Sequence, residues 1–189
     1  MAEPNGGNER SDLTQSGLAR LRAGDPHVGA LLDATYRQRM LRFCSGYLSD
    51  PSEAEDAVQE IFYKACKALD AGGAPKAFRP WLYKVARNHC LNRLRERGRR
   101  NCQLDQDLSP ENCTGNLTRL VREEMRSRIA HLVAALPSVD RELLRLRYAE
   151  ELSRAEMAQV LDMPESEVKT RLLRALQNLR DHTSLIDRG

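Results

Sequence analysis

Residues 153–180 read SRAEMAQVLDMPESEVKTRLLRALQNLR, and this stretch determines the fold of the C-terminal part of the chain. Ser153 and Glu156 fit a capping box, in which the two side chains satisfy free backbone N–H groups at a helix start. We therefore predict a short helix over 154–161, a turn at 162–164 and a longer helix from about 165 to 180. A short helix, a tight turn and a long helix are typical of a helix-turn-helix.

The longer predicted helix has one apolar face and one polar face. Apolar residues recur at helical spacing and predict a buried stripe of Val168, Leu172, Ala175, Leu176 and Leu179. The outward side chains are then Ser166, Glu167, Thr170, Arg174 and Gln177, flanked by Lys169 and Arg171. These residue types suit contacts with base edges and phosphates in a DNA major groove. An ordinary α-hairpin with a solvated face is the alternative interpretation.

A second helix is predicted over 50–69. Asp50 supplies an N-cap acceptor, Pro51 suits the first helical position, and Glu53 is the third residue. The predicted buried stripe consists of Ala54, Ala57, Val58, Ile61, Phe62, Ala65 and Leu69. The acids on the other face, which include Glu60, either form a solvated surface or dock a basic partner.

The next segment, residues 78–100, concentrates positive charge. Seven arginines and Lys84 stand against the single acid Glu96 from residue 79 onward, a local charge of +7, whereas the whole chain carries only +3. Such a surface suits nucleic-acid phosphates. Phe78 and Trp81 are expected in the core more than in base stacking, since Trp81, Val85 and His89 share one helical face.

The composition favours an all-α protein and excludes several classes. The 189 residues are 41% hydrophobic, 30% charged and 5% aromatic, and we find no alternating run that predicts a strand. No apolar run is long enough to span a membrane, and the first ten residues contain no secretory signal, so we expect a cytoplasmic protein without membrane insertion. The five cysteines, an odd number, do not indicate a disulfide framework.

The sequence indicates no enzyme and no cofactor. It contains no phosphate-cradling Gly loop and no nucleophile motif, and its four histidines are scattered. His89, Cys90, Cys102 and Cys113 could form a zinc set, although their spacing matches no common site. Small core residues are the simpler interpretation of Cys44, Cys66 and Cys90.

The pattern divides the chain into four parts. Residues 1–10 are polar and predicted to be a disordered tail, 11–100 form a first helical domain, 101–117 form a linker that contains Pro110 and Gly115, and 118–189 form the helix-turn-helix domain.

These segments, in this order, resemble the sigma factors of bacterial RNA polymerase, specifically the extracytoplasmic-function group of the sigma-70 family. Residues 50–62 are similar to region 2.2, and residues 78–100 to regions 2.3 and 2.4. Residues 136–172, with Leu136-Pro137, LLRLRY at 143–148 and the helix-turn-helix, resemble region 4. The resemblance covers the chain from about residue 18 to 180.

The resemblance implies two helical domains on a flexible linker and a role for three groups of residues. A docking set would bind the β′ clamp of core RNA polymerase: Glu53, Asp56, Gln59 and Glu60. A −10 set would recognise and help melt the −10 element: Lys84, Arg87, Asn88, Asn92 and Arg93. A −35 set would read the −35 element while region 4 sits on the β flap: Ser166, Glu167, Lys169, Thr170, Arg171 and Arg174.

The implied function is promoter-specific transcription initiation by polymerase, with an anti-sigma factor as a further partner. The main alternative is a helix-turn-helix repressor that binds DNA without polymerase, and the acidic 50–62 segment argues against it. Two departures from the family pattern affect expectations. Asp162 occupies a turn position where the family often has Gly, and the acidic start at 165–167 predicts a narrower sequence preference.

Overall fold

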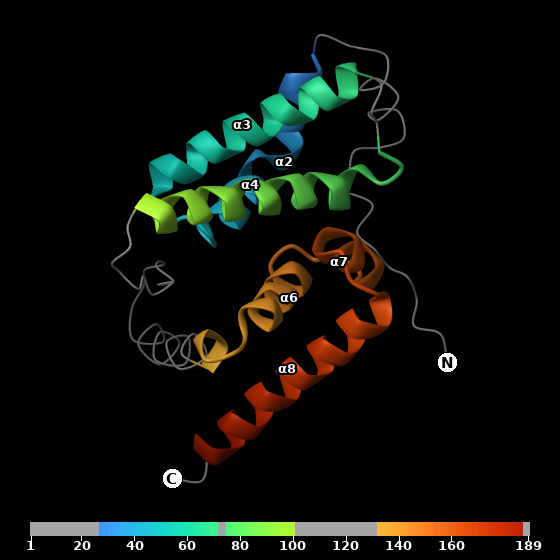
Figure 1. Ribbon diagram of the computed structural model, residues 1–189. Helices are drawn as coiled ribbons and strands as arrows, with labels where there is room; N and C mark the ends of the chain where they lie inside the picture. Colours follow the sequence, from blue (N-terminus) through green and yellow to red (C-terminus); the bar gives the residue numbers. More distant parts are fainter. Residues whose placement is uncertain (1–26, 72–74, 101–131, 187–189) are drawn as a thin grey trace, which may run out of the picture. The chain divides into compact units, whose positions relative to one another are not determined.

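The computed structural model describes residues 27–71, 75–100 and 132–186, and within these ranges every regular element is an α-helix (Figure 1). The all-α prediction is therefore confirmed for this part of the chain. The backbone contacts define two units, the first with α2, α3 and α4 and the second with α6, most of α7, and α8. The predicted tail at 1–10 and linker at 101–117 lie outside the described residues, so the domain boundaries remain a prediction.

The first unit consists of α2 (Val28–Ser45), α3 (Pro51–Asp70) and α4 (Phe78–Arg100), which pack against one another (Figure 1). The α3 start is the predicted one: Asp50 Oδ1 accepts a hydrogen bond from Ser52 N at 2.9 Å, and Pro51 is the first helical residue. The seven buried residues of α3 are those of the predicted stripe. Helical spacing therefore located the core-facing side of α3 correctly.

Aromatic rings join α2 and α4 of this unit. Phe43 of α2 meets Tyr83 of α4 edge to face, with ring centroids 5.1 Å apart, and Tyr36 lies 5.8 Å from Phe78. The core placement of Phe78 is confirmed, whereas Trp81 is half-buried beside it. Cys44 and Cys90 are fully buried, as small core residues should be. Burial and the nearby Asp70 raise the pKa of the half-buried Cys66 thiol, which disfavours its reactive thiolate.

The second unit contains α6 (Ser138–Tyr148), residues 154–158 of α7 (Arg154–Leu161) and α8 (Glu165–Ile186). The predicted capping box is present: Glu156 N donates to Ser153 Oγ at 3.2 Å, and Ser153 N donates to Glu156 Oε2 at 2.7 Å. Leu136, Leu144 and Ala175 form a buried cluster, against which Leu172, Leu176 and Leu179 pack. The apolar stripe predicted for α8 thus faces the core of its own unit.

Two details of the second unit differ from the sequence-based expectation or refine it. The last helix continues to Ile186 instead of ending near Arg180, because residues 181–186 contain no Gly or Pro to stop it. The turn follows Asp162, which adopts the left-handed conformation with φ 53° and ψ 46°. Asp tolerates this conformation better than most residues with a side chain, so the turn forms without Gly.

The structure bears on two further features, membrane-spanning helices and metal sites. Over residues 27–71, 75–100 and 132–186, no helix is both long and apolar enough to cross a membrane. The same ranges contain no group of three or more His, Cys, Asp or Glu side chains arranged to hold a metal ion. Cys102 and Cys113 of the considered zinc set lie outside the described residues, so the structure does not test that alternative.

Candidate nucleic-acid interface

The −10 set lies along one helix, α4, whose opposite side is anchored in the core. Leu82, Tyr83, Ala86 and Cys90 are fully buried, and this burial fixes the rotation of the helix. Asn88 and Asn92 are then exposed, while Lys84, Arg87 and Arg93 are half-buried. Cationic and amide side chains therefore occur together along the accessible side of α4, a chemistry that suits both phosphates and base edges.

The docking set lies on α3, next to α4. Asp56, Gln59 and Glu60 are exposed, and Glu53 is half-buried at the N-terminal turn. Acids in a first helical turn also interact favourably with the helix dipole, so Glu53 has a local role as well.

The structure brings two of the predicted sets together. Glu60 Oε1 of the docking set accepts a hydrogen bond from Arg93 Nη2 of the −10 set at 2.7 Å. About two turns nearer the N-terminal end of α3, Glu53 Oε2 lies 3.2 Å from Nη1 of Arg97. We call these two ion pairs the α3–α4 pairs. Sequence reasoning treated the acidic and basic surfaces as separate, and it did not single out Arg97.

Glu60 is the centre of a larger charged group. Its carboxylate also lies 3.9 Å from Lys64 Nζ and 3.8 Å from His89 Nε2. The hydrogen bond from Arg93 is the main reason that the pKa of Glu60 lies below its ordinary value, and the nearby His89, Arg93 and Lys64 charges act in the same direction. Glu60 is therefore an anion at neutral pH with several cationic neighbours.

His89 is the buried member of this group, with 8% of its surface exposed. Lys64 Nζ lies 2.9 Å from His89 Nδ1, and Nε2 has no hydrogen-bond partner among the described residues. A lysine ammonium can only donate, so we assign Nδ1 as the acceptor and place the ring proton on Nε2. Burial, with a smaller contribution from the Lys64 charge, lowers the pKa of His89 below 6.5.

The −35 set lies on α8, and its members differ in their exposure to solvent. Ser166, Lys169, Thr170 and Arg174 are exposed, whereas Glu167 and Arg171 are half-buried. Thr170 Oγ1 donates to the carbonyl oxygen of Ser166 at 2.9 Å, which leaves the hydroxyl oxygen as an acceptor. Lys169, Thr170 and Arg174 are therefore presented to solvent from two consecutive turns of α8.

Arg171 connects α8 to α6. Its Nε donates to Glu167 Oε1 at 2.8 Å, and its Nη1 lies 3.5 Å from Asp140 Oδ1 of α6. The hydrogen bond from Arg171 to Glu167 raises the pKa of the guanidinium above its ordinary value. Arg171 thus links α8 to α6 through an ion pair with Asp140.

The acidic start of α8 is partly neutralised within the protein. Glu167 pairs with Arg171, and Glu165 Oε1 lies 3.9 Å from Arg154 Nε across the turn. Because both carboxylates have a cationic neighbour, the start of α8 repels phosphates less than its sequence suggests.

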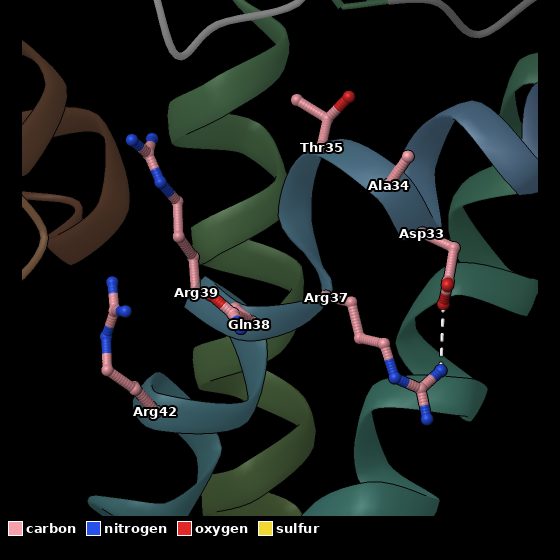
Figure 2. Close-up of a pocket in the computed structure, with 7 residues that line it drawn as sticks. All are labelled: Asp33, Ala34, Thr35, Arg37, Gln38, Arg39 and Arg42. Carbon is pink, nitrogen blue, oxygen red and sulfur yellow. Dashed lines mark hydrogen bonds and ion pairs between the residues drawn. The ribbon is translucent and has the colours of Figure 1, made fainter.

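Sequence reasoning missed two exposed features. Leu173 lies outside the predicted apolar stripe and is 57% exposed between Thr170 and Arg174, and the sequence analysis gave it no role. The second feature is a hollow of about 480 Å³ on α2 (Figure 2). Arg37 is paired there with Asp33 at 2.8 Å, while Arg39 and Arg42 extend from the other side of the helix.

Comparison with known proteins gives matches in both units. The family model for sigma-70 region 2 matches residues 32–100, and the model for sigma-70 region 4 matches residues 126–179. The RNA polymerase sigma-H factor of Pseudomonas aeruginosa is 31% identical over 170 residues, which cover 84% of this chain and 87% of that protein. The ECF RNA polymerase sigma-E factor of Escherichia coli is 32% identical over 174 residues, with coverages of 84% and 87%.

Solved structures show the same fold. CnrH in complex with the cytosolic domain of CnrY aligns with a TM-score of 0.65 at 23% identity, covering 94% of this chain and 99% of that one. The sigma factor RpoE in complex with the anti-sigma factor NepR from Bartonella quintana aligns with a TM-score of 0.57 at 21% identity, covering 88% and 91%. At these identities the structural likeness concerns the fold alone.

Proposed function

Because the chain belongs to the extracytoplasmic-function sigma factors of the sigma-70 family, we propose that it binds core RNA polymerase and directs promoter-specific transcription initiation. The observation that carries this proposal is the order of its parts: a region 2 match at 32–100 is followed by a region 4 match at 126–179. One module suits recognition and melting of the −10 element and the other reads the −35 element. Two modules on one chain raise each other's effective concentration at a promoter.

For the first module, we propose that the −10 set contacts the −10 element. Melting requires stabilisation of an unstacked base, which costs a few kcal/mol. The exposed amides of Asn88 and Asn92 can pair with base edges, and the α4 cations can neutralise phosphates. The docking set would bind a basic surface of the polymerase β′ clamp through its exposed acids.

For the second module, we propose that the −35 set reads the −35 element while the module contacts the β flap. Lys169, Thr170 and Arg174 are the primary candidates for DNA contact because they are exposed on consecutive turns. Arg174 would read a guanine and Lys169 would contact a phosphate.

Three further statements belong to the same proposal. Residues 11–100 and 118–189 are the two domains, and 101–117 is their tether. The protein acts by binding and not as an enzyme, and it works in the cytoplasm with the polymerase. An anti-sigma factor is a further partner. The structural relative RpoE was solved in complex with the anti-sigma factor NepR, and CnrH was solved in complex with the cytosolic domain of CnrY.

The decisive experiment is transcription in vitro with sigma-free core polymerase and a library of candidate promoters. A specific transcript that depends on this chain supports the proposal, and its absence with correctly folded protein would contradict it. A polymerase-independent repressor would bind the same DNA without core, and it would leave the acidic face of α3 and the region 2 match without a role.

A further inference from the structure

The α3–α4 pairs join residues for which different partners are proposed. Glu60 belongs to the docking set, and Arg93, 2.7 Å from it, belongs to the −10 set. Glu53 belongs to the docking set, and its neighbour Arg97 extends the basic side of α4 by one turn beyond Arg93. Each pair therefore occupies an acid that a basic protein surface would need and a cation that a DNA phosphate would need.

Neither pair is buried, and both can open. The side chains of Glu60 and Arg93 are 51% and 26% exposed, and those of Glu53 and Arg97 are 31% and 41% exposed. Ion pairs of this exposure contribute little to stability, because water and salt screen them. A partner of high charge density can therefore compete for either member without disturbing the fold.

The competition acts on both surfaces at once. A basic surface that binds Glu53 and Glu60 leaves Arg93 and Arg97 without their acidic neighbours, and a nearby phosphate then interacts with two uncompensated cations. DNA bound to these arginines frees the two carboxylates in the same way. Linkage requires the two effects on affinity to be equal.

We propose that the α3–α4 pairs couple polymerase binding to DNA binding: in the free protein they partly neutralise both surfaces, and occupation of the acidic face releases Arg93 and Arg97 for phosphate contact. This coupling rests on the proposed function. It assigns Arg97 as a further phosphate-contacting residue. It also predicts that the free chain binds DNA more weakly than its α4 charge suggests.

The first test uses the full chain without polymerase. Its affinity for a short fluorescein-labelled single-stranded DNA of mixed sequence is measured by fluorescence anisotropy at low salt. Glu53→Gln should raise the affinity about two- to fivefold, the range expected for loss of one exposed ion pair. Asp56→Asn is the matched control, since it removes the same charge from the same helix and the described residues include no α4 ion pair to Asp56.

A double-mutant cycle separates the ion pair from general charge effects. In an Arg97→Gln background, the gain from Glu53→Gln should disappear, whereas the effect of Asp56→Asn should be the same in both backgrounds. The proposal is overturned if Glu53→Gln and Asp56→Asn have equal effects, or if the gain persists without Arg97. Thermal unfolding of each variant checks that the fold is intact.

The second test measures the reciprocal effect on core polymerase. Arg97→Gln should tighten binding to core about two- to fivefold, because it frees the Glu53 carboxylate. Arg37→Gln is the control, since it removes the same charge from α2, where Arg37 pairs with Asp33. Unchanged or weaker binding by Arg97→Gln relative to this control overturns the coupling. The DNA measurements need no polymerase, so a failed coupling and a failed sigma function give different results.

Discussion

The ammonium of Lys64 in α3 lies 2.9 Å from Nδ1 of the buried His89 in α4, so a cation and an imidazole share a contact between two helices. Burial of the imidazole, and then the Lys64 charge, lowers the pKa of His89 and so disfavours its protonated form. The contact also lies next to Glu60 and Arg93, and thus at the junction of the proposed polymerase and DNA surfaces.

We expect His89 to make the stability of the first unit depend on pH. Its folded pKa lies below 6.5, chiefly through burial and then through the Lys64 charge; Arg93 acts in the same direction, while Glu60 and Glu96 oppose it. The unfolded chain therefore binds more protons just below pH 6.5, so stability is complete above this pH and falls as the pH decreases toward the folded pKa. The contribution of Glu60 to the stability of the folded unit is lost only at lower pH, below 4.5.

The measurement is the free energy of unfolding by urea on both sides of pH 6.5. In the His89→Gln variant, the free energy of unfolding should not decrease across this pH window. The variant His27→Gln, which replaces an exposed histidine, should retain the decrease. An unchanged pH dependence in His89→Gln would show that another group is responsible.

We expect the backbone of the helix-turn-helix turn to tolerate Gly but not a β-branched residue at position 162. Asp162 has φ 53°, a region that costs a β-branched side chain about 1–2 kcal/mol. Asp162→Val should therefore lower the free energy of unfolding by about this amount, and Asp162→Gly should retain it. Chemical denaturation of the two variants is the check, and equal losses would contradict the strain argument.

We expect Arg174 and Arg171 to have different roles on α8. Replacing the exposed Arg174 with Ala should change the preference at one −35 position by about 1–3 kcal/mol, without altering the melting temperature. Replacing Arg171 with Ala should lower the melting temperature and weaken binding to all sequences, because the contacts with Glu167 and Asp140 are lost. Binding selection on a randomised −35 library distinguishes the two outcomes, and identical profiles would refute the division of roles.

We expect charge reversal on the acidic face to weaken polymerase binding. Asp56→Lys combined with Glu60→Lys should lower the affinity for core about tenfold or more, because like charges would then face a basic surface. Asp70→Lys, at the other exposed end of α3, is the control and should have little effect. Equal affinities of the double variant and the wild-type chain would show that the polymerase docks elsewhere.

The sequence alone determined the features that depend on near neighbours in the chain. The buried stripe of α3, the capping box of Ser153 and Glu156, and the bounds of α7 follow from spacings of three and four residues and from backbone N–H groups that need acceptors. The family resemblance rested on the same local patterns. The exposure of Leu173 agrees with its position outside the predicted stripe of α8.

Only the tertiary structure decided which charges meet. Glu60 and Arg93 are 33 residues apart in the chain, and their contact depends on how far α3 and α4 are shifted and rotated against each other. That register is set by the packing of buried side chains such as Ile61, Ala65 and Ala86, and no periodicity in either helix specifies it. The sequence showed an acidic helix and a basic helix; their packing made the two charged surfaces one connected group.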